Sequence, residues 1–310
     1  MSGVFASLLI KLLPLYGLVA LGWLGGRFLK TDRVALADVM IYLIAPVFVF
    51  GAVARLKFQM EYLALPLILA GVSMLMAFVT LRLARVMNFT PRIRGLVSFA
   101  GGTGNTGYFG VPVVLAVLGG EWLGVYLILN LGMMLYEASL GYYLLARGAF
   151  SVRESLRRVR RLPVLYAMAA GMAYSISGLA LPDSFVEVWQ NFRGAYVVLG
   201  MMMVGISFAY VRTRDWDMPL LALLMTSKFI LWPLLMGGLV LLDAHVLHLF
   251  GGPIHVLLMI SALVPVAANS AVYAAQVNIH PERMALAVLL STLLALAIIP
   301  AFFSMAGLGY

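Results

Sequence analysis

Long apolar runs, separated by short polar or charged connections, cover almost the whole chain. Each run has roughly the 20 residues that an α-helix needs to cross a bilayer core about 30 Å thick. Pro, Gly and charged residues separate the runs. The ten runs are 4–28, 34–54, 62–86, 95–119, 122–146, 163–181, 192–211, 218–242, 253–278 and 284–307. The pattern predicts an all-α integral membrane protein with ten transmembrane helices.

Composition supports this class and excludes several others. Of 310 residues, 64% are hydrophobic and 11% are charged, whereas a soluble domain carries about 25% charged residues. The ten runs leave no room in these 310 residues for a soluble catalytic domain. The chain has no cysteine, which excludes disulfides, thiolate metal sites and cysteine nucleophiles.

The net charge of +9 could indicate a nucleic-acid partner, but the basic residues lie in the connections between apolar runs. Odd-numbered connections hold Arg27, Lys30, Arg33, Arg82, Arg85, Arg92, Arg94, Arg147, Arg153, Arg157, Arg158, Arg160, Arg161, Arg212, Arg214 and Arg283, whereas even-numbered ones hold Arg55, Lys57 and Arg193. Basic loops stay in the cytoplasm. We therefore predict a multi-pass protein of the cell inner (plasma) membrane, with both termini extracytoplasmic and no nucleic-acid partner.

A basic cytoplasmic connection at residues 148–162 divides the chain into two halves, 1–147 and 163–310, with five predicted spans each. Because five is odd, the second half enters the membrane in the opposite orientation. This is the arrangement of an inverted-topology repeat.

The fourth span of each half is interrupted. Residues 101–112 read GGTGNTGYFGVP, and the span over 253–278 contains Pro265 and Asn269. Unwound backbone is tolerated in hydrocarbon only where it is buried in protein or lines a watery cavity. Matching interruptions in two halves are the best sequence indication of a transporter site near the bilayer midplane.

The residues at the interruptions suit an anionic ligand. They are Gly104, Gly107, Gly110, Pro112 and Asn105 in the first span, with Pro265 and Asn269 in the second. The glycines are expected to adopt positive φ and to let the backbone approach a ligand closely. Each proline removes an N–H and forces a break. The asparagines offer donors and acceptors, so they can bind a carboxylate or replace lost backbone partners. The alternative is that both breaks are kinks or packing sites.

Three further polar residues inside predicted spans are candidates for the site. Lys228 could balance a substrate's negative charge or replace a coupling cation, because a buried ammonium is a functional candidate by default; alternatively it donates to carbonyls of an unwound helix. Glu137 could carry a proton, pair with a cation such as Lys228, or form a hydrogen bond across helices. Asn130, seven residues before Glu137, could line the same cavity or form an interhelical hydrogen bond.

Three motifs carry a family resemblance. GNTGYFGVP in the fourth span, PVAANSAVYAAQ in the ninth and SKFILWP in the eighth resemble the auxin efflux carrier (AEC) family, which includes bacterial malonate-type carriers and plant PIN proteins. The resemblance covers the whole chain in length, span number and order of motifs.

The resemblance implies two inverted five-helix repeats with crossed helices 4 and 9, a fold like that of bile-acid symporters and sodium/proton antiporters. Helices 1, 2, 6 and 7 would form a scaffold and a homodimer contact, and helices 3–5 and 8–10 a moving transport subdomain. In that fold Asn105 and Asn269 would flank the crossover with Pro112 and Pro265 and would contact the carboxylate of an organic anion. Together with the intramembrane polar residues, the predicted substrate-binding residues are Asn105, Gly104, Thr106, Gly107, Tyr108, Asn269, Asn130, Glu137 and Lys228.

The leading hypothesis is a secondary carrier of small organic anions, either auxin-like or dicarboxylate weak acids, that works by elevator-type alternating access. No GxxxxGK[ST] motif is present, so the energy would come from a proton or sodium gradient, or from the substrate's own gradient and the membrane potential. We predict no other cofactor and no metal; the partners are the organic anion and membrane lipid.

Three alternatives remain. The first is a sodium- or proton-coupled symporter of a bile-acid-like amphipathic substrate, and the second is a non-transporting receptor for the same ligand. The third, an intramembrane enzyme, is disfavoured because neither HExxH nor GxSxG occurs. We therefore assign no catalytic residues.

Overall fold

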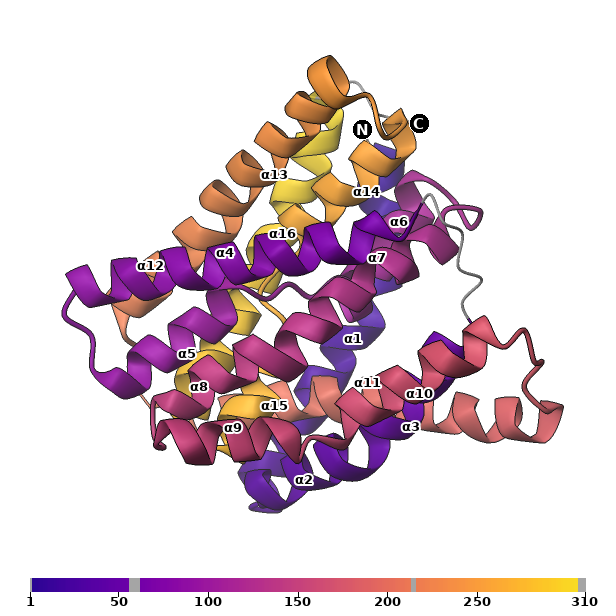
Figure 1. The fold of residues 1–310 in the computed structure, drawn as a ribbon. Helices are drawn as coiled ribbons and strands as arrows, with labels where there is room; N and C mark the ends of the chain where they lie inside the picture. The colour runs from indigo at the N-terminus through magenta and orange to yellow at the C-terminus, as the bar shows by residue number, and fades with distance from the viewer. Residues whose placement is uncertain (1, 56–61, 213–215, 306–310) are drawn as a thin grey trace.

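The computed structural model describes residues 2–55, 62–212 and 216–305, and every regular element in them is a helix (Figure 1). The α-helices are α1 (Ser2–Phe28), α2 (Arg33–Val39), α3 (Ala45–Ala54), α4 (Ala64–Val86), α5 (Pro91–Gly101), α6 (Val111–Val117), α7 (Leu123–Tyr136), α8 (Tyr142–Arg147), α9 (Val152–Arg160), α10 (Pro163–Ile176), α11 (Asp183–Phe208), α12 (Met218–Thr226), α13 (Trp232–Leu242), α14 (Gly252–Leu263), α15 (Asn269–Gln276) and α16 (Pro281–Met305).

In the described part of the chain, five π-helical segments join or interrupt these helices: η1 (Met40–Ile44), η3 (Thr106–Gly110), η4 (Glu137–Gly141), η6 (Ser227–Leu231) and η7 (Asp243–Leu247). Such turns are rare and are often found at functional sites. Glu137 is the first residue of η4, and Lys228 is the second residue of η6. Both ionisable residues of the predicted site therefore lie where the helical hydrogen-bond pattern is locally widened.

Within the described residues, six continuous helical stretches are long and apolar enough to cross a membrane: Arg33–Ala54, Ala64–Val86, Leu123–Arg147, Asp183–Phe208, Met218–Leu247 and Pro281–Phe303. Large apolar side chains such as Leu67, Ile176 and Leu234 are exposed on the outside of the bundle. Exposed apolar surface of this extent suits lipid as the solvent. The chain is an all-α membrane protein, as predicted.

One predicted boundary was wrong. The apolar pattern placed the start of the seventh span at residue 192, but α11 already begins at Asp183. The first turns of α11 contain Asp183, Glu187 and Asn191. These polar side chains lower the hydropathy of the segment, so the apolar pattern does not include it. An acidic residue in the first turn interacts favourably with the helix dipole. Arg193 consequently lies inside α11 rather than in a connection.

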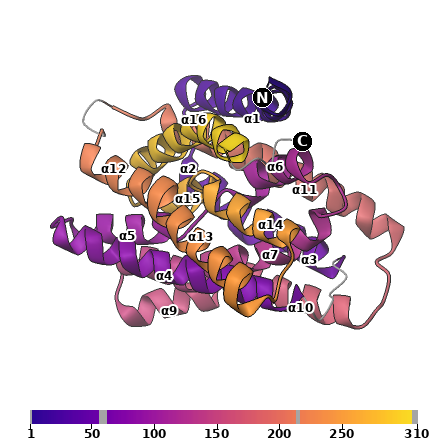
Figure 2. The same cartoon turned by 90° about the horizontal axis from the view of Figure 1, so that it is seen from above.

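Close backbone contact joins α1 to α11. A Cβ atom on Gly22 of α1 would lie 2.1 Å from the Met202 carbonyl oxygen, and one on Gly205 of α11 would lie 1.9 Å from the Val19 carbonyl oxygen. Small residues let membrane helices approach this closely, which increases their packing contacts. In Figure 2, α1 runs along one edge of the bundle next to α16, and α9 and α10 lie at the opposite edge.

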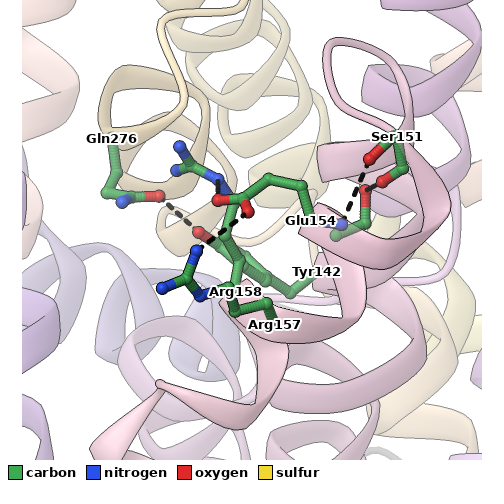
Figure 3. Close-up of polar contacts among 7 residues, drawn as sticks. Tyr142, Ser151, Glu154, Arg157, Arg158 and Gln276 are labelled. Atoms are coloured by element: carbon green, nitrogen blue, oxygen red, sulfur yellow. Dashed lines mark hydrogen bonds and ion pairs between the residues drawn. The ribbon is translucent and has the colours of Figure 1, made fainter.

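The basic connection folds as the short amphipathic helix α9. Ser151 caps it by accepting a hydrogen bond from the Glu154 N–H at 3.2 Å, and Glu154 forms an ion pair with Arg158 at 3.3 Å (Figure 3). The Ser-x-x-Glu spacing is that of a capping box. The helix packs against α8, with Ser155 fully buried.

Candidate functional site

Two non-helical segments lie within the membrane helices. The first break, residues 102–105, separates α5 from η3 and α6; the second break, residues 264–268, separates α14 from α15. The two breaks touch, because the backbone N–H of Asn105 donates to the Pro265 carbonyl oxygen at 2.8 Å. The structure thus interrupts both predicted spans, and it brings the interruptions together.

Side chains from other helices satisfy the carbonyl groups around the first break. The Tyr136 hydroxyl donates to Ser98 (3.0 Å) and Phe99 (3.1 Å), Trp232 Nε1 to Gly101 (2.7 Å), Lys228 Nζ to Thr103 (3.3 Å) and the Tyr126 hydroxyl to Thr106 (3.1 Å). An unpaired buried carbonyl would cost about 1–3 kcal/mol. These donors explain how an irregular segment persists in the interior of a membrane protein.

Gly104 in the first break and Gly110 in η3 are closely packed and do not adopt positive φ, whereas a Cβ on Gly107 would meet no described atom within 4 Å. A Cβ on Gly104 would lie 2.8 Å from Lys228 Nζ, and one on Gly110 would lie 1.9 Å from the Tyr126 hydroxyl. Among the described glycines, positive φ occurs at Gly119 and Gly178. The predicted positive φ at residues 104, 107 and 110 was therefore wrong, because donors from neighbouring helices, and not left-handed turns, stabilise the unwound backbone.

A cavity of about 990 Å³ lies against both breaks. Its lining includes the predicted residues Gly104, Asn105, Thr106, Gly107, Tyr108, Pro112, Asn130, Glu137 and Asn269. Two predicted residues lie outside the lining. Pro265 forms the backbone contact to Asn105, and Lys228 lies behind the first break.

Asn105 presents hydrogen-bond donors to the cavity. Its Oδ1 accepts from the Tyr108 N–H at 3.2 Å, which fixes the orientation of the amide group. No described residue accepts a hydrogen bond from its Nδ2, and the side chain lines the cavity although the residue is 4% exposed. Next to it, the Thr106 hydroxyl donates to Asn130 Oδ1. Asn105 therefore has two spare N–H donors at the inner end of the cavity.

A hydrogen-bonded chain links Glu137 to the opposite wall. Asn269 Nδ2 donates to Glu137 Oε2 at 2.9 Å, and the Tyr196 hydroxyl donates to Asn269 Oδ1 at 3.1 Å. Glu137 is buried, lines the cavity and has a neutral amide as its partner. The ion pairs between described residues include neither Glu137 nor Lys228.

Lys228 donates to a carbonyl of an unwound helix, which was the second of the two interpretations of this residue. It is 1% exposed, its Nζ donates to the Thr103 carbonyl, and it lies 4.3 Å from the Trp232 ring centroid. Thr103 in turn lies 3.2 Å from the Ser270 hydroxyl, which connects this buried side to α15. Lys228 thus contacts the unwound helix, and the Gly104 backbone separates it from the cavity.

Sequence reasoning missed an aromatic row that forms one wall of the cavity. Trp189 and Phe48 stack at 6.4 Å between centroids, Phe48 and Tyr196 at 4.4 Å, and Tyr196 lies 5.5 Å from Tyr108. These rings come from α3, α11 and η3. Aromatic residues inside apolar spans look like ordinary packing, so no sequence signal marked the row.

The cavity is open toward one end of the bundle. Arg55, Tyr62, Glu121 and Trp122, which flank the even-numbered connections, line it, whereas no described residue of the odd-numbered connections does. At the other end, the Tyr142 hydroxyl of α8 donates to Gln276 Oε1 of α15 at 2.6 Å (Figure 3). The Arg33–Glu282 ion pair, at 2.7 Å, also closes this end.

Neither the models of known protein families nor the curated proteins contain a match to this chain. The fold and the site define a class of protein: an all-α membrane protein with a one-sided cavity at the meeting point of two broken helices. Its function has to be inferred from the chemistry of that cavity.

Proposed function

We propose that the protein is a secondary carrier of small organic anions, of the auxin efflux carrier type suggested by its motifs. The observation that carries the proposal is the cavity, which opens at one end of the bundle and has two broken membrane helices at its wall. A carrier must expose its site to one side of the membrane at a time, and broken helices of this kind form the sites of many secondary transporters.

The spare donors of Asn105 favour an anionic group as the ligand. A carboxylate accepts hydrogen bonds from amide N–H groups, and such charge-assisted bonds are stronger than neutral ones. Lys228 lies directly behind Gly104 and, in its protonated form, would add positive charge next to this position without contacting the cavity. Auxin-like aromatic acids and dicarboxylates both fit a volume of about 990 Å³, which is at the upper end of ordinary small-molecule sites.

Transport would follow an elevator-type movement. In this proposal the two five-helix halves are inverted repeats, and the helices carrying the breaks move against the scaffold of α1, α2, α3, α10 and α11. Tyr196 of α11 connects the two parts, because it hydrogen-bonds to Asn269 through its hydroxyl and to Tyr108 through its carbonyl oxygen. Both bonds would have to break and re-form in each cycle.

Glu137 is proposed to couple transport to protons. A carboxylate ligand and an ionised Glu137 would repel each other inside one cavity, so binding of the anion should be accompanied by binding of a proton at Glu137. Anion affinity in the wild type would then fall as the pH rises. Glu137→Gln keeps the size of the side chain and removes its charge, so its affinity should be independent of pH. Titrating affinity against pH in both proteins tests this; parallel profiles would contradict proton coupling.

Counterflow in liposomes tests the carrier function. Proteoliposomes loaded with an unlabelled acid are diluted into the same labelled acid, with indole-3-acetate, malonate and taurocholate as separate probes. A carrier accumulates label transiently inside, and Asn105→Ala should abolish this accumulation. Binding without accumulation would support the receptor alternative, and accumulation of taurocholate alone would support the symporter of amphipathic substrates.

A further inference from the structure

Arg55 and Arg193 lie near each other at the opening of the cavity. They are two of the three basic residues that the sequence pattern assigned to even-numbered connections, away from the cytoplasm, and both line the cavity. The third exception, Lys57, lies outside the described residues. Basic residues away from the cytoplasmic side are uncommon in membrane proteins, so their gathering at one cavity calls for a specific reason.

Trp189 holds the two arginines together. The Arg55 guanidinium carbon lies 4.7 Å from the Trp189 ring centroid, and that of Arg193 lies 6.0 Å from it. The ring itself is fixed, because Trp189 Nε1 donates to the Phe48 carbonyl at 2.9 Å and the residue is 6% exposed. A guanidinium over an aromatic ring keeps its N–H donors free at its edge.

No described carboxylate neutralises this pair. The arginines of the opposite end form ion pairs, as in Arg33–Glu282 and Arg283–Asp217, but the ion pairs between described residues include neither Arg55 nor Arg193. Both side chains are exposed. Two positive charges on one ring, without a counter-ion from the described chain, produce an electropositive rim.

This rim is separate from the breaks. Phe48 and Tyr196 lie between Trp189 and Tyr108 in the aromatic row. An anion at the arginines would therefore be held away from Asn105 and Asn269, with the rings leading inward along one wall.

We propose that Arg55 and Arg193, supported by Trp189, form an outer anion-binding site that takes the carboxylate of an organic acid entering the cavity. Charged rims concentrate oppositely charged ligands and raise their rate of association. The role of the site in loading the breaks rests on the carrier function proposed above; its ability to bind an anion does not.

Quenching of Trp189 fluorescence tests the site without a transported substrate. Iodide is the anionic quencher and acrylamide the neutral one. The fluorescence of Trp189 is obtained by subtracting the fluorescence of the matching Trp189→Phe variant from that of each protein. In Arg55→Gln/Arg193→Gln, iodide quenching of Trp189 should fall about threefold, since two charges at this range each enrich an anion locally despite screening by salt. Acrylamide quenching should stay the same.

Matched variants keep the test decisive. Arg82→Gln removes an exposed charge from the opposite end of the bundle, outside the cavity lining, and should leave both quenchers unchanged. Glu121→Gln removes a negative charge from the same lining and should raise iodide quenching. If acrylamide quenching changes in the double variant, the lysine versions Arg55→Lys/Arg193→Lys decide, because they retain the charge and should retain the iodide response.

Unchanged iodide quenching in the double variant, or loss of the iodide response in the lysine versions, would overturn the proposal. This outcome is separable from failure of the carrier function. Iodide enrichment without counterflow would leave the anion site standing and remove its loading role, whereas counterflow without iodide enrichment would leave the carrier function standing and remove the anion site. In an active carrier, the double variant should also raise the external KM severalfold while kcat is retained.

Discussion

The two faces of the first break contrast in how their polar groups are used. On the buried face, Lys228 donates to the Thr103 carbonyl in the first break, and Trp232 and Tyr136 donate to carbonyls in the last turn of α5. On the cavity face, Asn105 keeps its amide N–H groups without an acceptor among the described residues, and Glu137 has one neutral partner. Tyr136 and Glu137, which are adjacent in the sequence, thus differ in role: the hydroxyl of Tyr136 supports the backbone, whereas the carboxyl group of Glu137 lines the cavity.

The comparison distinguishes polar groups that stabilise the fold from polar groups that can bind a ligand. Groups whose hydrogen bonds are completed inside the protein stabilise an irregular backbone, which would otherwise be costly in a membrane. Groups that retain unused donors next to an accessible cavity are available to a ligand. Substitutions that remove a donor from the buried face should therefore affect stability first, and those on the cavity face should affect binding first.

The largest effect is expected from Trp232→Phe. The variant leaves the Gly101 carbonyl without its donor and opens space around a fully buried side chain, so the free energy of unfolding should fall by about 3 kcal/mol. Denaturant unfolding in detergent measures this. Trp216→Phe, at a side chain that is 52% exposed, should change it by less than about 0.5 kcal/mol. Equal losses in both variants would show that the hydrogen bond from Trp232 to Gly101 has no specific role in stability.

Lys228→Gln should have an intermediate effect. Glutamine can still donate to the Thr103 carbonyl but lacks the charge behind Gly104, so anion affinity should fall by about tenfold while binding persists. The measurement is a ligand titration followed by thermal stability. Lys30→Gln, in an odd-numbered connection, is the control. Complete loss of binding would mean that Lys228 contacts the ligand, and unchanged affinity would mean that its charge does not reach the cavity.

Tyr196→Phe should have the smallest effect. It removes the hydroxyl that donates to Asn269 Oδ1 but keeps the ring stacked on Phe48 at 4.4 Å. The free energy of unfolding should fall by about 1 kcal/mol, the net contribution of one hydrogen bond, and the counterflow rate should change by less than threefold. A stability loss as large as that of Trp232→Phe would show that this contact supports the fold.

Much of the site was predictable because broken membrane helices leave a sequence signal. Gly104, Asn105 and Pro265 interrupt apolar runs, and the requirement to satisfy freed backbone groups makes such interruptions rare. The contact between the two breaks gives this signal a structural basis. The all-helical membrane class followed from composition and run length in the same way.

The remainder depends on tertiary packing, which a hydropathy pattern does not encode. The donors Trp232 and Tyr136 come from helices far from the first break in sequence, and Trp189 is indistinguishable from a packing residue until its neighbours are known. Arg193 was misplaced because the polar first turns of α11 resemble a connection. The sequence pattern placed Arg193 away from the predicted cytoplasmic side, unlike most basic residues, but only the fold shows that it lines the same cavity as Arg55.

Thermal stability of the purified protein across a panel of carboxylic acids, with and without sodium, tests whether the cavity face of the first break binds an anion. A ligand that binds the folded state raises the melting temperature by mass action. We expect at least one acid to stabilise the wild type, and we expect Asn105→Ala to fold but to show no such stabilisation. If no acid stabilises the wild type, or if Asn105→Ala responds as the wild type does, the assignment of an anion site to the cavity face of the first break is wrong.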